Sequence, residues 1–203
     1  MKKIVLALVV LVTTVFASQA QVNFGIKGGI GVYNFSGDDV DDADGFEAKV
    51  GPVGGVYAAI PVSEMFAVTP ELQFCGQGAK MKESGMTSKW LINYINIPVM
   101  FQYRNPSGFF AETGPQIGFR SSAKGKYDGG EIDLKDEIKS TAFSWNFGAG
   151  YKSSVGVGVA ARYCLNLNSI AEDSDGESVD VKNSGFQVAL FFEFGGKSGN
   201  ARK

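Results

Sequence analysis

Apolar and polar residues alternate with a period of two in eight separate segments of this chain. A period of two places successive side chains on opposite faces of a strand, whereas a helix repeats every ~3.6 residues. In the clearest segment, Phe66, Val68 and Leu72 fall on one face and Thr69 and Glu71 on the other. The eight segments span residues 22–33, 50–60, 66–74, 90–103, 109–119, 141–151, 155–167 and 186–194. This pattern predicts an all-β fold.

The connections between these segments alternate between short and long. The short ones are residues 61–65, 104–108 and 152–154, and the long ones are 34–48, 76–89, 121–140 and 168–184. Short turns at one end and long loops at the other are typical of outer-membrane barrels, whose tilted strands need about 9–11 residues to cross the bilayer. The sequence therefore predicts an eight-stranded antiparallel up-and-down transmembrane β-barrel over residues 21–194. An even number of strands leaves both termini in the periplasm, with residues 195–203 as a polar periplasmic tail.

A soluble sandwich or a lipocalin-like barrel is the alternative fold, and the composition of the two strand faces decides between them. The polar faces hold mainly Gly, Ala, Ser, Asn and Gln, with few of the Lys and Glu residues that solvate a water-exposed surface. Small side chains suit the narrow interior of an eight-stranded barrel, and the apolar faces then meet lipid. Large aromatic residues near the strand ends are expected to form the interfacial girdles; they are Tyr33, Tyr103, Phe109, Tyr151 and Phe194.

The N-terminus has the three parts of a secretory signal peptide. Lys2 and Lys3 precede an uncharged apolar run over residues 4–16, and the small residues Ser18 and Ala20 then stand at the positions that signal peptidase reads. A retained membrane anchor is the alternative, but a spanning helix needs about 20 apolar residues. We therefore predict that residues 1–20 are removed by cleavage before Gln21, and that the protein is exported to the bacterial outer membrane.

The composition excludes several classes of function. The chain of 203 residues contains no histidine, and its formal net charge is −2. Histidine is the usual general base for serine and cysteine nucleophiles and the commonest zinc ligand, so we expect no enzymatic activity, no metal and no cofactor. A weakly acidic chain offers no basic surface for nucleic acid, so no nucleic-acid partner is expected.

A few charged residues lie on the faces that we assign to the lumen. Glu71, Glu112 and Arg162 all stand opposite the apolar face of their strands, and Lys27 shares this parity in the first segment. Glu193 has the same parity but lies at a strand end. Paired carboxylates could support acid–base chemistry, but an isolated charge in a narrow lumen is unfavourable. We therefore predict a structural ion network in the lumen, formed by Arg162, Glu71, Glu112 and Lys27.

The two cysteines, Cys75 and Cys164, also fall on lumen-facing positions. They belong to the third and seventh strands, which lie on opposite walls of an eight-stranded barrel. A disulfide needs Cα atoms within about 7 Å, so both cysteines are predicted to be free thiols.

Two further patterns resemble binding motifs but have simpler explanations. Two of the long loops are acidic, in residues 38–47 and 172–180, yet neither has the spacing of a calcium-binding loop, so we interpret them as solvated surface loops. The glycines of the first segment lack the helix and the Lys-Ser/Thr pair of a phosphate loop, and are better explained by close packing inside the barrel.

Several short motifs occur in the order found in one known family. They are PELQF at 70–74, GQGAK at 76–80, NYINIPV at 93–99, ETGPQIG at 112–118, and Ala161-Arg162-Tyr163 with Leu165. In these the chain resembles the PorT-like outer-membrane β-barrel domain of Bacteroidetes, over residues 22–194. The resemblance implies the fold and the location, but no assigned activity. Asn96 stands where the family often has Glu.

The sequence leaves three functions open. The leading hypothesis is a non-enzymatic barrel with a structural or surface-interaction role and a largely plugged lumen. Its expected partners are outer-membrane lipid and surface or envelope proteins, whose identity the sequence leaves open. The alternatives are a small channel or carrier for small or apolar molecules, and an accessory component of a secretion system, which the name of the resembled family suggests.

Overall fold

The computed structural model describes residues 22–37, 46–83, 86–127, 130–172 and 180–194. The predicted signal peptide, the predicted polar tail and most of the two acidic loops lie outside these residues. The described strands are β1 (Asn23–Ser36), β2 (Phe46–Pro61), β3 (Phe66–Gln77), β4 (Ala79–Glu83), β5 (Met86–Arg104), β6 (Phe109–Tyr127), β7 (Gly130–Asp133), β8 (Thr141–Lys152), β9 (Val157–Asn166) and β10 (Lys182–Phe194). Within the described ranges, no helix is long and apolar enough to span a membrane.

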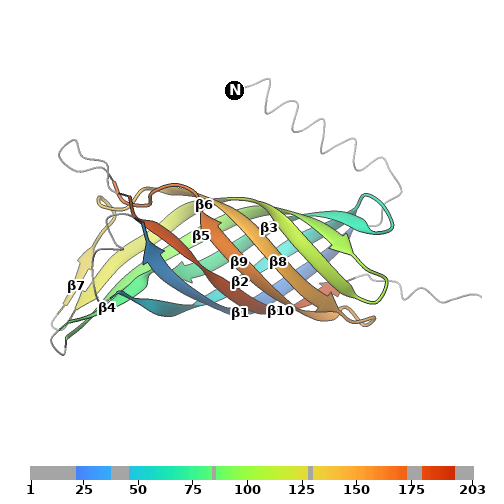
Figure 1. The fold of residues 1–203 in the computed structure, drawn as a ribbon, viewed down its shortest axis with the longest axis horizontal. Helices are drawn as coiled ribbons and strands as arrows, with labels where there is room; N and C mark the ends of the chain where they lie inside the picture. The colour runs from blue at the N-terminus through green and yellow to red at the C-terminus, as the bar shows by residue number, and fades with distance from the viewer. Residues whose placement is uncertain (1–21, 38–45, 84–85, 128–129, 173–179, 195–203) are drawn as a thin grey trace, which may run out of the picture.

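The strands form one closed antiparallel barrel (Figure 1). Each wall strand pairs with its neighbours in the chain, and β10 closes the barrel on β1 in a register that places Phe24 opposite Phe194. Eight walls result, because β4 continues β3 beyond Gly78 and β7 is an additional strand paired only with β6. The predicted eight-stranded up-and-down barrel is confirmed, and each predicted segment lies in a different wall.

The strands run further than the sequence pattern indicated. Residues assigned to long loops form the hairpins β4–β5 and β6–β7, which extend the wall past the end where the long connections lie. Gly78 marks the break between β3 and β4 with a φ of 126°, a conformation that favours glycine. On the neighbouring walls, the register between β5 and β6 shifts at Asn93 and Tyr94. By the rule for outer-membrane barrels, the short-turn end is periplasmic and the hairpin end is extracellular.

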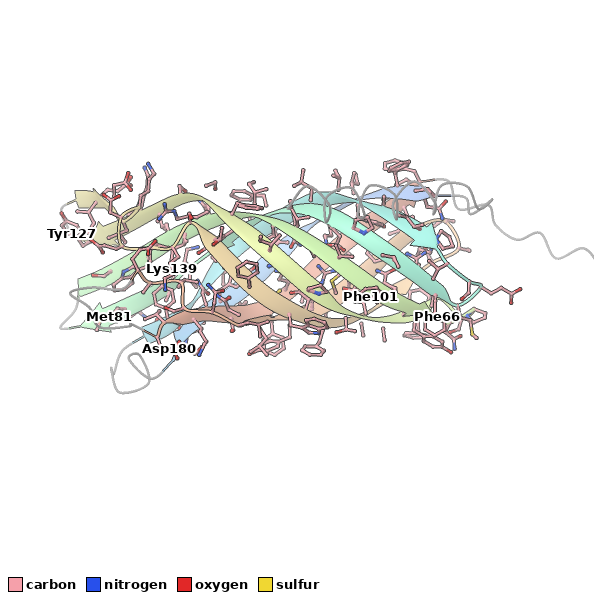
Figure 2. All side chains as sticks on the ribbon, turned by 90° about the horizontal axis from the view of Figure 1, so that it is seen from above. Phe66, Met81, Phe101, Tyr127, Lys139 and Asp180 are labelled. Carbon is pink, nitrogen blue, oxygen red and sulfur yellow. The ribbon has the colours of Figure 1, made fainter. Side chains whose placement is uncertain are left out.

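The two faces of the wall differ as the alternation predicts. Large apolar side chains lie on the outside, such as Phe66, Phe101 and Leu190, each about half exposed or more. Figure 2 shows side chains projecting outward along the length of the barrel, with Phe66 and Phe101 among them. Polar side chains such as Gln73, Asn96 and Asn146 are buried inside. An apolar exterior around a polar interior is the arrangement of a transmembrane barrel.

One aromatic residue was assigned to the wrong face. Tyr33 was expected in an interfacial girdle, but its side chain is fully buried in the lumen. The other four predicted girdle residues, Tyr103, Phe109, Tyr151 and Phe194, are exposed on the outside. Successive residues of a strand point to opposite faces, and Tyr33 follows Val32, which lies on the outer face. Its position in the alternation, and not its side-chain type, therefore decides its face.

Candidate functional site: the lumen of the barrel

The periplasmic half of the lumen contains a network of ion pairs centred on Arg162. The structure brings together all four residues proposed from the sequence: Lys27 from β1, Glu71 from β3, Glu112 from β6 and Arg162 from β9. Arg162, Glu71 and Glu112 are each 6% exposed. We call this set, with the residues that continue it below, the ionic layer.

The guanidinium of Arg162 holds both carboxylates. Its Nη1 and Nη2 donate to Oε2 and Oε1 of Glu71, each at 2.9 Å, which is a two-pronged geometry. Its Nε and Nη2 also donate to Oε1 of Glu112, at 2.9 and 2.7 Å. The ammonium of Lys27 forms an ion pair with Glu71 from the other side. Burying these charges is tolerable because each is paired and hydrogen-bonded.

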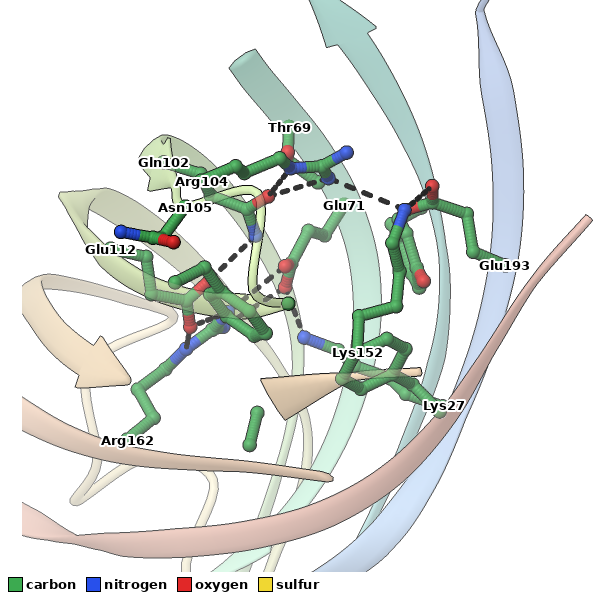
Figure 3. A pocket seen from close by; sticks show the side chains of 15 residues that line it. Lys27, Thr69, Glu71, Gln102, Arg104, Asn105, Glu112, Lys152, Arg162 and Glu193 are labelled. Atoms are coloured by element: carbon green, nitrogen blue, oxygen red, sulfur yellow. Dashed lines mark hydrogen bonds and ion pairs between the residues drawn. The ribbon is translucent and has the colours of Figure 1, made fainter. Parts of the chain in front are cut away.

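The network continues to the periplasmic mouth through residues that the sequence analysis did not select. Gln102 Nε2 donates to Glu112 Oε2 at 2.8 Å, and Gln102 Oε1 accepts from Arg104. Arg104 and Lys152 then both contact the carboxylate of Glu193, at 3.3 and 2.5 Å (Figure 3). The connected residues come from seven of the eight walls, so the ionic layer ties the barrel together across its interior.

The middle of the lumen contains a cluster around the amide of Gln187. Its Nε2 lies 2.9 Å from the hydroxyl of Tyr33, 3.1 Å from Sγ of Cys164 and 3.8 Å from Sγ of Cys75. Cys75 in turn donates to Oε1 of Gln73 at 3.3 Å. Both cysteines are buried free thiols, as predicted. The side chains nevertheless reach one common group from opposite walls, which the argument from wall separation did not anticipate.

The extracellular half of the lumen is filled by apolar side chains. We call this cluster the apolar plug; its buried members are Phe35, Ala79, Ile92, Tyr94, Ala123, Leu134, Ile138, Ala142 and Ile170. Leu134, Ile138 and Ile170 come from connections, and the others from the strand walls. A backbone hydrogen bond from Lys139 to Ile170 and the bridge between Ile138 and Ala171 hold the two connections together. Among the described residues, this end of the lumen is therefore packed by apolar side chains.

The charged groups of the ionic layer are already engaged with one another. Among the described residues, no group of three or more Cys, Asp or Glu side chains is arranged to hold a metal ion. The carboxylates of Glu71 and Glu112 share the guanidinium of Arg162, so each already accepts strong hydrogen bonds. What this arrangement can do is fill and rigidify the interior.

Taken together, the closed wall, the apolar exterior and the filled polar interior define an eight-stranded membrane-spanning β-barrel. Residues 16–172 match the family of the outer membrane protein beta-barrel domain, and the chain belongs to that family. The family places the protein in the bacterial outer membrane.

Solved structures of similar fold come from other outer-membrane barrels. Neisserial surface protein A (NspA) superposes with a TM-score of 0.57 at 11% identity, covering 86% of this chain and 99% of that one. Ail, the attachment invasion locus protein of Yersinia pestis, superposes with a TM-score of 0.50 at 14% identity, with the same coverage. At such low identity these likenesses concern the fold alone. No curated protein matches the sequence.

Proposed function

We propose that this protein is a non-enzymatic outer-membrane barrel with a largely plugged lumen, whose role is structural or lies in interactions at the cell surface. The observation that carries the proposal is the filling of the lumen at two levels, by the ionic layer and by the apolar plug. An eight-stranded barrel has an interior that side chains can fill completely. Our proposal is that two such regions in series block the water path through the described part of the barrel.

Three further features belong to the same proposal. The exterior apolar side chains contact outer-membrane lipid, and the extracellular hairpins β4–β5 and β6–β7 are available to surface or envelope partners.

The motif resemblance supports membership in the PorT-like group and, with it, the alternative role of an accessory component in secretion. Cleavage before Gln21 follows from the signal-peptide pattern, and mass spectrometry of the protein from outer membranes should find Gln21 at the N-terminus.

Electrical recording from planar bilayers tests the proposal against the channel alternative. The refolded protein should insert without producing conductance steps above the leak of the bare bilayer. Insertion must be confirmed separately, for example by protease digestion that spares the barrel. Reproducible unitary steps from the inserted wild-type protein would instead support a channel and would contradict the plugged lumen.

A further inference from the structure

The lumen is hollow between the ion pairs of Arg162 and the periplasmic turns. This cavity, which we call the cup, has a volume of about 550 Å³ including its open mouth. Glu71, Arg162 and Glu112 form its floor, and the mouth is bordered by Arg104, Lys152 and the turn at residues 105–108. Figure 3 shows these side chains around the cavity. In the described part of the chain, the apolar plug occupies the other end of the lumen, so the cup opens toward the periplasmic turns.

The charges that line the cup do not balance. Four cations line it, Lys27, Arg104, Lys152 and Arg162, against three carboxylates, Glu71, Glu112 and Glu193. The imbalance is located at the mouth, where Arg104 and Lys152 share the single carboxylate of Glu193. The side chain of Glu193 is 2% exposed, whereas those of Arg104 and Lys152 are 22% and 28% exposed. The excess positive charge is therefore accessible from the periplasm, and an anion entering the cup would neutralise it.

The wall of the cup is apolar and aromatic. Phe191 contacts Tyr57 on one side and Phe110 on the other in edge-to-face geometry, with ring centroids 6.2 and 5.9 Å apart. Ala160 adds a small apolar surface beside them. The ring of Tyr57 fits into this wall because Gly25 lacks a side chain: a Cβ at Gly25 would lie 2.2 Å from that ring. A ring-sized apolar body could pack against these rings with favourable geometry.

Two buried hydroxyl groups in the lining have no hydrogen-bond partner among the described residues. They are the hydroxyl of Tyr57, in a residue 8% exposed, and Oγ1 of Thr69, in a residue 1% exposed. Buried polar atoms are rarely left unsatisfied unless a water or a ligand serves them. Independently of the charge imbalance, these two hydroxyls are therefore available to a water or to a ligand bound in the cup.

From these features we propose that the cup is a binding site, open to the periplasm, for a small amphipathic carboxylate: a molecule with one carboxylate head and a ring-sized apolar body. The carboxylate lies between Arg104 and Lys152, and the apolar body lies against Tyr57, Phe110 and Phe191. A few convergent polar groups in a mainly apolar cavity are what small-molecule sites usually have. The site needs no passage through the barrel, so it does not depend on whether the plugged lumen is correct.

Binding can be tested with 3-phenylpropionate as the probe and the protein in lipid nanodiscs. The backbone amide signals of Gly108, Ala160 and Phe191 should shift and saturate with the probe, while those of the apolar plug should not. The amine of the same shape, 3-phenylpropylamine, should produce no saturable shift, because the mouth carries excess positive charge. Equal shifts from the acid and the amine, or shifts that do not saturate, would overturn the proposal.

Two variants change the charge at the mouth in opposite directions, and a third variant is the control. Lys152→Met should weaken binding of the carboxylate about three- to fivefold, the range expected for a partly exposed charge pair. Glu193→Gln should strengthen it by a similar factor, because it releases both cations from their shared carboxylate. Lys82→Met, which removes a comparable ion-paired lysine at the extracellular end, is the matched control and should leave binding unchanged.

Changes of opposite sign separate a binding role from a structural one, since both mouth variants break ion pairs of the same network. If Lys152→Met fails to fold, Arg104→Met replaces it with the same expected loss. If Lys152→Met and Glu193→Gln weaken binding of the probe equally, the proposed carboxylate site in the cup is wrong. If the protein neither conducts nor binds the probe, the binding site is wrong and the plugged lumen stands. If the wild-type protein conducts and binds the probe, the plugged lumen is wrong and the binding site stands.

Discussion

In the periplasmic half the lumen is crossed by charged side chains from seven walls, whereas near the extracellular hairpins apolar side chains from walls and connections pack inside it. The ionic layer depends on specific partners, because each charge is buried and would be unsatisfied alone. The apolar plug depends on volume, because its members need only fill space. The interior of one narrow barrel is thus occupied in two ways, which should differ in their sensitivity to substitution.

The largest effect is expected from Arg162→Ala, which leaves two buried carboxylates without their shared partner. The free energy of unfolding should fall by about 3–5 kcal/mol, the usual range for breaking a buried ion pair. Urea unfolding in detergent micelles, followed by tryptophan fluorescence, measures it. The substitution Glu112→Gln in the Arg162→Ala background should restore part of the loss, since it removes one unpaired charge. Additive losses in the double variant would contradict a network centred on Arg162.

A smaller effect is expected from Ile170→Ala in the apolar plug. Ile170 is fully buried, so truncation should cost about 2–3 kcal/mol from lost burial and the remaining cavity. Ile132→Ala is the control, because Ile132 is 45% exposed on β7 and its truncation should cost below about 0.5 kcal/mol. No second substitution of a charge should rescue Ile170→Ala. Rescue by Glu112→Gln would show that the two regions are not independent.

The cluster in the middle of the lumen is expected to respond less. Gln187→Leu removes the amide that serves Tyr33 and Cys164, and should cost about 1–2 kcal/mol through the unsatisfied hydroxyl. The same substitution should increase the rate at which a maleimide alkylates Cys75 and Cys164 in the folded protein. Tyr33→Phe supplies the comparison, because it keeps the ring but removes the hydroxyl. Unchanged stability and alkylation in Gln187→Leu would mean that the cluster is held by packing alone.

The smallest effect is expected at the extracellular tip. Hydrogen bonds from Lys124 and then Lys126 hold the pKa of the Glu131 carboxyl below its ordinary value of 4.5. Because the pKa of Glu131 is lowered in the folded state, its interactions with the two lysines stabilise the fold above the ordinary pKa. This stabilisation is lost as the pH falls through the folded-state pKa. The side-chain carboxyl NMR signal of Glu131 should therefore titrate with a midpoint below 4.5, while the signals of β8 stay constant. A midpoint at or above 4.5 would show that Glu131 is not held by these lysines.

The wall of the barrel could be predicted from the sequence because lipid and lumen impose opposite chemistry on alternate residues. The same parity selected Arg162, Glu71, Glu112 and Lys27, which the structure brings into contact. Parity could also have selected Arg104 and Lys152, and it did mark Glu193. These lie at strand ends, where a charge can equally point to water.

The apolar plug could not be predicted in this way. Beyond the membrane the outer face is no longer apolar, so the alternation fades although the strands continue into β4, β7 and the ends of β5 and β6. In addition, the register shift where Asn93 and Tyr94 of β5 pair with Ser122 and Arg120 of β6 changes which residues of β6 point inward. The one available signal was that Leu134, Ile138 and Ile170 are apolar residues within polar connections.

If two independent regions block the lumen in series, as we propose, the bilayer conductance of four proteins should reveal it. They are the wild type, Arg162→Ala, the apolar-plug variant Leu134→Ala/Ile170→Ala, and the combination of all three substitutions. Because either region alone blocks the path, the first three should be silent, and only the combined variant should conduct. Conductance in Arg162→Ala alone, equal to that of the combined variant, would contradict the claim and would leave the ionic layer as the single closure.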